Sequence, residues 1–484
     1  MKTRGQVLIT MMVLTFVALL FITGLVSWAI GSKRVSQKII LRERAFQIAE
    51  AGNEYYRWHL AHAREDYQDG QSWCCSSPPC TWCGPYVHDY KDKDGNVIGQ
   101  FSLRIKPPTI GSTLVTIEST GRVVGETLLK RVIETKLAIP SWTKYAVAAN
   151  DKMRFGYGTE VFGEIHSNDG IRFDGVAHNI VTSAKTTYDD PDHDGPEEWA
   201  VHTHAPPNGQ DPIPPNPWNN RTDVFKAGRQ VSVPAIDFAG ISGDLSQIKT
   251  QAQQNGRYFA HSGVLGYYIS LKTNDTFDLY KVTSLMPRPS NSCTANQDGW
   301  GTWSIQNKTF LQNYSFPSNG LIFVEDNLWV DGQINTARLT IASARFPENP
   351  STNTSITINN DLKYTNYDGQ DVIGLIAQKN INVGLYSEDD LQIDAALIAK
   401  NGRVGRYYYN QQYCSNYALR QKITLNGMIG TNQRYGFSYV CGENYCSGYN
   451  LRILNYDANL LYGPPPNFPL TSDQYTTLSW REIY

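Results

Sequence analysis

The chain opens with a long apolar segment that predicts a membrane-spanning helix. No charged residue occurs between Val7 and Ile30. As an α-helix with a rise of about 1.5 Å per residue, this segment would be about 36 Å long, enough to cross a bilayer core of about 30 Å. Residues 33–63 contain no proline and a single glycine, and apolar side chains recur there along one stripe. The pattern predicts that residues 1–65 comprise a short leader, the span and a long amphipathic helix.

Three short runs with alternating apolar and polar residues follow a polar, cysteine-rich connection. The connection covers about residues 64–100, and the runs lie at residues 99–106, 114–118 and 128–137. Alternation with a period of two is typical of strands that bury one face. The pattern predicts an antiparallel meander that packs on the long helix, so that residues 66–139 form a second segment.

From about residue 145, short phrases recur with the form apolar-x-apolar-Asp/Asn-Gly-x-apolar. They occur at Ile171–Ala177, Leu328–Ile334 and Ile423–Ile429. Each phrase predicts a short strand, a bend at the glycine and a second strand, and such units bury their apolar faces by stacking on one another. We therefore expect residues 140–484 to form a right-handed β-helix or β-solenoid-like head.

The spacing of these phrases is irregular, which leaves a β-sandwich or an irregular β-roll open as alternatives to the solenoid. The intervals range from about 10 to 40 residues, whereas a strict repeat has a fixed period. The stretch at about 185–320 is rich in proline, aspartate and histidine at first and then contains a helix-like segment at 238–255. We expect it to be a loop and α/β insertion, and the tail from Gly463 to be a surface strap.

Composition excludes two broad classes of protein. Of the 484 residues, 41% are hydrophobic and 12% aromatic, enough for a sizeable core, so global disorder is excluded. Lys and Arg total 43 and Asp and Glu total 45, which gives a formal net charge of −2. A large nucleic-acid interface requires a basic excess, so no nucleic-acid footprint is expected.

Two motifs in the N-terminal region add information that periodicity does not give. The first is the short basic leader Lys2-Thr3-Arg4-Gly5-Gln6, which ends in glycine immediately before the apolar run. The second is Arg44-Ala-Phe-Gln-Ile-Ala-Glu-Ala-Gly52, which is similar to an AF-x-x-AEAG stretch. Together with the long helix ahead of a β-rich body, these motifs resemble the type IV pilus minor pilins and the pilin-assembly family.

The resemblance covers residues 1–65, with a weaker extension to about residue 139, and it implies a pilin-like helix and sheet. It also implies cleavage by a prepilin peptidase between Gly5 and Gln6. The implied partners are the membrane, crossed once, and other pilins, contacted through the N-terminal helix. The implied location is the cell membrane before assembly and then the cell surface or an extracellular filament, with most of the chain outside the cytoplasm.

One position departs from the family pattern. Major pilins carry glutamate at the fifth mature position, which is Thr10 here. The departure fits a minor or tip subunit, or a tethered protein that never polymerises. Two other interpretations stay open: a simple single-span anchor, and a signal peptide cut after Ser27-Trp28-Ala29. The basic residues after the span favour a cytoplasmic C-terminal side by the positive-inside rule, whereas the cysteines and the β-rich body favour export.

Eight cysteines are present, an even number, and four of them are clustered. Cys74, Cys75, Cys80 and Cys83 could hold zinc as four thiolates, but the adjacent pair makes tetrahedral geometry awkward and an exported location favours disulfides. Cys441 and Cys446 could close a tight loop. Cys293 and Cys414 could pair with each other or with the rest, and the connectivity stays open.

One acidic loop has the pattern of a cation site. Asp190, Asp192 and Asp194 alternate before Gly195, as in the first half of a calcium loop, and Glu198 could close the site. The position of the usual closing glutamate is Val201, so the full EF-hand pattern is absent. The sequence predicts a Ca²⁺ site here, and the alternative is a solvated acidic loop.

Histidines in the same stretch suggest a different metal. His202 and His204 would lie on one side of a strand as a pair of imidazoles for a transition metal, with His193 nearby. No third ligand is evident from the sequence.

Exposed aromatic residues are the candidates for recognition. Trp73, Trp82, Trp300, Trp303 and Tyr408 lie in loop-like regions, where they could stack on sugars or partner proteins or simply anchor their loops. The motifs of common catalytic sites are absent. Asp389, Asp390 and Asp394 could form a carboxylate pair for glycoside hydrolysis, but a chain with 45 acidic residues offers many such pairs.

These observations favour a non-enzymatic minor or tip pilin-like surface protein that mediates adhesion or pilus assembly. Its ligand would be a surface, a cell or a glycan. One alternative is a membrane-anchored β-helix enzyme or binding protein for polysaccharide, and another is a structural envelope protein on a single span. The expected fold is mostly β with one long N-terminal helix, a pilin-like antiparallel sheet and a β-solenoid-like head.

Overall fold

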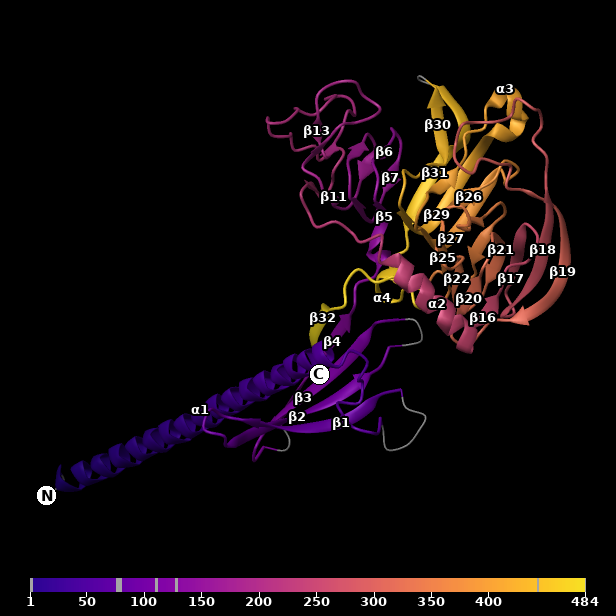
Figure 1. Cartoon of the computed structure of the whole chain (residues 1–484). Helices are drawn as coiled ribbons and strands as arrows, with labels where there is room; N and C mark the ends of the chain where they lie inside the picture. Colours follow the sequence, from indigo (N-terminus) through magenta and orange to yellow (C-terminus); the bar gives the residue numbers. More distant parts are fainter. Residues whose placement is uncertain (1–2, 75–80, 109–111, 127–128, 442–443, 484) are drawn as a thin grey trace. The chain divides into compact units, whose positions relative to one another are not determined.

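A computed structural model describes residues 3–74, 81–108, 112–126, 129–441 and 444–483, and the chain divides into two compact units (Figure 1). Unit 1 consists of Met1–Pro107, Val115–Ala138 and Tyr475–Tyr484. Unit 2 consists of Pro108–Leu114 and Ile139–Gln474. In sequence, nearly all of unit 2 is therefore inserted into unit 1.

Helix α1 (Thr3–His62) has two halves with different surroundings. Apolar side chains from Val7 to Ile40 are exposed, and this is the one helix in the described part of the chain that is long and apolar enough to cross a membrane. In the second half, which packs on the sheet of unit 1, five apolar side chains are buried: Ala45, Ile48, Ala49, Tyr56 and Leu60. The predicted long N-terminal helix is confirmed.

The sheet of unit 1 has five antiparallel strands in the order β1-β2-β3-β4-β32. Their bounds are β1 (Cys83–Lys91), β2 (Val97–Lys106), β3 (Val115–Val123), β4 (Lys130–Ala138) and β32 (Thr476–Ile483). The alternating burial of β2 and β3 follows the period of two in their sequences. The predicted antiparallel meander is confirmed, and the sheet has two further strands, β1 and β32, that the pattern did not indicate.

Two glycines let α1 lie against β3 with almost no gap. A Cβ atom at Gly121 would lie 2.0 Å from the carbonyl oxygen of Ala45 and 2.5 Å from the backbone nitrogen of Ala49. A Cβ atom at Gly52 would lie 2.2 Å from the hydroxyl of Ser119. Gly52 is the last residue of the motif that is similar to AF-x-x-AEAG. Its close contact with Ser119 gives this residue a packing role.

Unit 2 consists mainly of short parallel strands that pair in columns. The longest column runs β16 (Arg257–Phe259), β20 (Leu321–Val324), β22 (Arg338–Ser343), β25 (Val372–Ala377), β27 (Asp390–Ala399), β29 (Leu419–Thr431), β5 (Tyr145–Ala149), β8 (Glu164–Ser167), β11 (Val181–Ser183) and β15 (Arg229–Gln230). A second runs β17 (Gly266–Lys272), β21 (Leu328–Ile334), β24 (Leu362–Tyr364), β27, β29, β31 (Asn444–Tyr456), β7 (Glu160–Val161) and β10 (Val176–Ala177).

Shorter elements complete unit 2. From β21, a third parallel column continues through β23 (Ile356–Thr357), β26 (Ile381–Val383) and β28 (Val404–Arg406), and a separate parallel sheet contains β6 (Met153–Phe155), β9 (Ile171–Phe173) and β14 (Val201–His202). Antiparallel additions are β12 (Thr187–Tyr188) with β13 (Glu198–Trp199), β18 (Thr276–Leu285) with β19 (Ile305–Ser315), and β30 (Ser438–Cys441). The helices are α2 (Ile241–Asn255), α3 (Gln411–Cys414), α4 (Asn459–Tyr462) and two 3₁₀ turns, Trp142–Lys144 and Ser415–Ala418.

The glycines of the recurring phrases lie where the backbones of neighbouring strands approach. A Cβ atom at Gly332 would lie 2.2 Å from the carbonyl oxygen of Leu271, and one at Gly427 would lie 2.0 Å from that of Ala395. Both glycines have positive φ, which other residues rarely adopt. The phrases therefore mark bends within the continuous strands β21 and β29, and their apolar residues point into one large core.

The path of the chain through unit 2 differs from the expected order. The chain enters the longest column at β5, which pairs with both β29 and β8 (Figure 1). The segment at about 185–320, expected as an insertion, supplies strands β15, β16 and β17 to the columns. The tail, expected as a strap, ends in strand β32 of unit 1. The right-handed solenoid stays a prediction.

Candidate metal centre

A small hairpin in unit 2 collects carboxylates and imidazoles from a short stretch of chain. Strand β12 pairs antiparallel with β13, which places Tyr188 opposite Glu198. Two residues later β14 pairs in parallel with β9, and His202 lies opposite Arg172. The hairpin loop therefore returns Asp190 and His193 to the strands that carry Glu198 and His202, and His204 follows two residues after the second strand.

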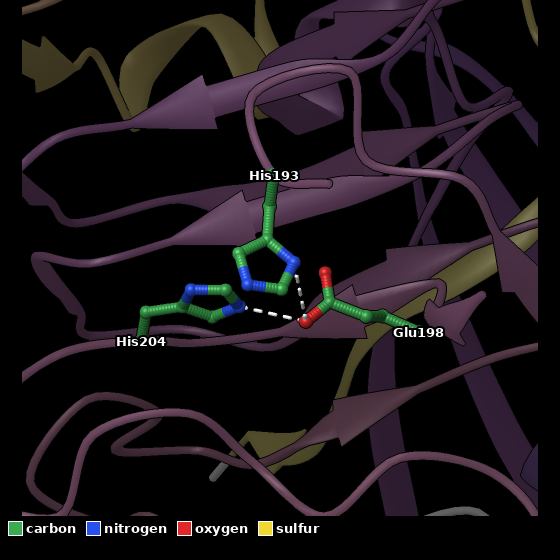
Figure 2. A group of neighbouring side chains, drawn as sticks. All are labelled: His193, Glu198 and His204. Atoms are coloured by element: carbon green, nitrogen blue, oxygen red, sulfur yellow. Dashed lines mark hydrogen bonds and ion pairs between the residues drawn. The ribbon is translucent and has the colours of Figure 1, made fainter. Parts of the chain in front are cut away.

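Glu198 is the common member of two groups of three side chains. In the outer trio, Glu198 Oε1 lies 2.7 Å from His204 Nε2 and 4.0 Å from His193 Nδ1. Figure 2 marks both contacts as dashed lines. The imidazole planes of His193 and His204 are perpendicular, with ring centres 4.8 Å apart. The side chain of His193 is 34% exposed, so this trio faces solvent.

The inner trio is fully enclosed. His202 Nε2 lies 2.9 Å from Glu198 Oε2 and 3.6 Å from Asp190 Oδ2. None of the three side chains is more than 3% exposed. Buried ionised groups are costly unless they are paired or bind a metal, so this trio requires a compensating charge.

Other groups fix the orientation of these side chains. His202 Nδ1 lies 3.1 Å from the carbonyl oxygen of Trp199, which can only accept, so Nδ1 carries a proton. The amide of Gln210 donates to Glu198 Oε1. The backbone N–H of Asp192 donates to Asp190 Oδ1 over 3.0 Å. Backbone and amide partners of this kind are typical of positioned metal ligands.

The protonation of the cluster follows from its mixture of charges. Burial works against ionisation of Asp190, but His202 and the backbone N–H of Asp192 outweigh it and lower the pKa of Asp190 to about 2. Burial likewise opposes ionisation of Glu198, and the neighbouring imidazoles hold its pKa below the usual range. Burial opposes protonation of His202, but Asp190 and Glu198 raise its pKa. Both carboxylates are therefore ionised at neutral pH.

The four residues of the calcium prediction do not converge. Asp190 and Glu198 belong to the inner trio, but Asp192 pairs with Arg434 at 2.6 Å and with Arg154 at 3.7 Å. Asp194 is exposed and belongs to neither trio. Ca²⁺ prefers six to eight oxygen ligands, whereas the groups that do converge include imidazoles. A Ca²⁺ site in this loop stays a prediction.

The sequence indicated the histidine pair and, in a separate calcium prediction, Asp190 and Glu198, but not that these two sets meet in one cluster. In extended chain, Glu198, His202 and His204 have the same parity and fall on one face. This shared face was the sequence signal that could have linked Glu198 to the two histidines. Asp190 lies across a hairpin of two-residue strands, which no periodicity indicates.

The described cysteines form three disulfides: Cys74–Cys83, Cys293–Cys414 and Cys441–Cys446. Cys75 and Cys80 lie outside the described residues. Because Cys74 and Cys83 bond to each other, these two are not thiolate ligands of a zinc ion.

The aromatic candidates are divided between the two units. Trp73 stacks near Tyr86, with ring centres 5.1 Å apart, and Trp82 lies under the guanidinium of Arg104, all in unit 1. In unit 2 the three remaining candidates hold loops in place. Trp300 donates to the carbonyl oxygen of Tyr408, Trp303 donates to that of Gly299, and the ring of Tyr408 packs on Tyr439.

The remaining candidates have structural surroundings as well. Gly5 and Gln6 lie within α1. Asp394 is buried and accepts hydrogen bonds from Tyr367, Gln392 and Asn426, while Asp390 pairs with Lys422. These two carboxylates are therefore engaged separately.

A large cavity of unit 2 borders the same hairpin loop through Asp192. It has a volume of about 760 Å³, and its lining includes Arg154, Arg403, Arg434 and Arg452 together with Tyr157, Tyr435 and Tyr439. The guanidinium groups favour anionic ligands, and the tyrosine rings favour flat or sugar-like ones.

Comparison with known proteins gives distant likeness to solved structures. No protein-family model matches the chain, and no curated protein matches it. Among solved structures, the competence-associated pilin ComZ from Thermus thermophilus aligns with 92% of this chain and 98% of its own length. The sequence identity is 14% and the TM-score is 0.30.

Proposed function

We propose that this protein is a membrane-anchored, type IV pilin-like surface subunit of the minor or tip class. The observation that carries the proposal is the division of α1. Its apolar half is exposed from Val7 to Ile40, whereas its second half is buried against a five-stranded antiparallel sheet. An exposed apolar helix needs a bilayer or the helices of other subunits around it.

We propose that unit 2, the head, binds its target without catalysing a reaction. The cavity lined by four arginines and three tyrosines offers charge-assisted hydrogen bonds and stacking to a polar ligand. This combination favours an anionic glycan on a surface or on another cell. Polysaccharide binding is thus part of the proposal. Polysaccharide cleavage is not, because Asp390 and Asp394 are tied to separate partners.

The experiment that tests the proposal is to determine the mature N-terminus by mass spectrometry of material from cells that express the protein naturally. Prepilin processing predicts a chain that begins at Gln6. Gly5→Val should leave Met1 in place, because the peptidase requires the small residue. Gly24→Ala is the matched control, since a Cβ atom there meets nothing within 4 Å.

Two other outcomes would refute pilin-like processing. A start near Ile30 would show a secreted protein that has lost its anchor. An intact Met1 in the unmodified chain would show a simple membrane anchor. Cell-surface filaments sheared from the same cells should contain the processed form if the subunit assembles.

A further inference from the structure

The charges around Glu198 do not balance. Asp174, Asp190 and Glu198 are all buried, and Arg172 pairs with Asp174 at 2.8 Å and with Asp190 at 3.5 Å. Among the described residues, no other lysine or arginine forms an ion pair with these carboxylates. The other partners of Asp190 and Glu198 are imidazoles, which are neutral when they bind a metal. With these imidazoles neutral, one guanidinium is present for three carboxylates, which leaves two negative charges inside the protein.

Two atoms of the inner trio also lack a hydrogen-bond partner. They are Glu198 Oε2 and His202 Nε2, on side chains that are 3% and 1% exposed. The atoms lie 2.9 Å apart but are not aligned as a hydrogen bond. Nδ1 of His202 carries a proton toward the carbonyl of Trp199, so in the neutral ring the lone pair at Nε2 points among carboxylate oxygens. A cation between these atoms would remove the repulsion.

The Glu198 oxygen of the outer trio, by contrast, already has hydrogen-bond partners. Glu198 Oε1 receives a hydrogen bond from His204 Nε2 at 2.7 Å and another from the amide of Gln210. These donors hold the carboxylate in place and leave its second oxygen directed to the inner trio. The two oxygens of Glu198 thus have different roles.

We propose that the inner trio binds one divalent cation of the zinc class, through Asp190 Oδ2, Glu198 Oε2 and His202 Nε2. Ligand atoms about 2.0–2.2 Å from a tetrahedral ion lie about 3.4 Å apart. The separations of His202 Nε2, 2.9 Å from Glu198 Oε2 and 3.6 Å from Asp190 Oδ2, lie on either side of that value. A charge of +2 neutralises the two uncompensated carboxylates, and a mixed nitrogen and oxygen set suits Zn²⁺ and its neighbours.

The proposed ion would have a structural role. Asp190 is the second residue of the hairpin loop, Glu198 begins β13 and His202 ends β14. Binding therefore links three points of a segment whose strands have only two residues each. This role is independent of the proposed surface function, because it concerns the stability of the head alone.

The experiment uses the full chain in detergent, stripped with a chelator and titrated with Zn²⁺ while bound metal is measured. One equivalent should bind per chain. Glu198→Gln and His202→Ala should each weaken binding by about tenfold or more, as expected when a ligand is lost. The matched controls Glu197→Gln and His178→Ala should bind as the unmodified chain does, since neither residue belongs to the inner trio. Millimolar Ca²⁺ should not displace the ion.

A measurement on the unmodified chain removes any dependence on how the variants fold. Pulsed electron paramagnetic resonance of bound Cu²⁺ counts the coordinated imidazoles, and the inner trio predicts one. Two imidazoles, or a loss on His193→Ala as large as on His202→Ala, would place the ion in the outer trio and overturn the assignment. Absence of Zn²⁺ binding, or displacement by Ca²⁺, would overturn the zinc-class site itself.

Discussion

The disulfide between Cys293 and Cys414 should be the strongest covalent contributor to the stability of the head. The two residues are 121 positions apart in sequence, whereas Cys441 and Cys446 are 5 apart. Both Cys293 and Cys414 are fully buried. Around them lie the buried side chains Leu385, Tyr407, Tyr409 and Ala418.

The expected magnitudes follow from the conformational entropy that each bond removes from the unfolded chain. The loss is about 2.1 + 1.5R ln n in cal/mol/K for a loop of n residues. For a loop of about 120 residues this gives about 5 kcal/mol at 25 °C, and for a loop of about 5 residues it gives about 2 kcal/mol. Replacing the long-range pair should therefore cost about 3 kcal/mol more than replacing the short-range pair.

The assay compares the variants C293A/C414A and C441A/C446A with the unmodified chain in detergent. Urea unfolding followed by tryptophan fluorescence gives the free energy of unfolding for each. Alanine avoids placing a new hydroxyl in the apolar cluster around Cys293 and Cys414. Equal losses in the two variants, or a larger loss in C441A/C446A, would refute the argument from loop closure.

Three further predictions concern other regions. Gly121→Ala should destabilise unit 1 by about 1–3 kcal/mol in urea unfolding, because the new Cβ would meet the helix backbone at Ala45. The control Gly31→Ala should not change the free energy of unfolding, because a Cβ atom there meets nothing within 4 Å. Burial and the charge of Asp237 raise the pKa of Asp244 to about 6, so the folded state binds more protons than the unfolded chain between pH 4 and 6. The free energy of unfolding should then fall over that range by at most about 3 kcal/mol relative to Asp244→Asn, and equal pH profiles would contradict this. Arg452→Ala should weaken binding of polygalacturonate by about fivefold or more if the arginine-lined cavity holds an anionic glycan, while Arg257→Ala, outside that cavity, should leave it unchanged.

The elements that the sequence predicted correctly are those with local signals. The uncharged run from Val7 to Ile30 requires no knowledge of distant residues, and neither does the alternation in β2 and β3. Strand β32 was missed for the opposite reason. Its residues are mostly exposed, so it has no buried face to produce a period of two, and its partner β4 lies more than 300 residues earlier.

The candidate site also combines a feature with a local sequence signal and a feature without one. His202 and His204 were recognised as a pair because they are two residues apart on an extended chain. Their relation to Asp190 depends on the hairpin of β12 and β13, which is too short for any pattern to show. The calcium motif gave the right stretch of chain, but arginines from distant segments pair with Asp192 and leave only part of the motif at the cluster.

The topology gives a physical reason why a large head can be combined with the small sheet. Thr476 of β32 pairs directly with Ala138 of β4, so the chain leaves unit 1 and returns to it at neighbouring positions of one ladder. Cross-strand ion pairs, Arg131 with Glu482 and Arg481 with Glu134, join the same two strands. For the host sheet, an insertion whose ends are adjacent has the same entropic cost as a long hairpin loop. The entropy lost in closing such a loop rises only slowly with its length. The sheet can therefore keep its register whatever the size of the head, and stability and ligand binding in unit 2 can change without altering how α1 packs on β3.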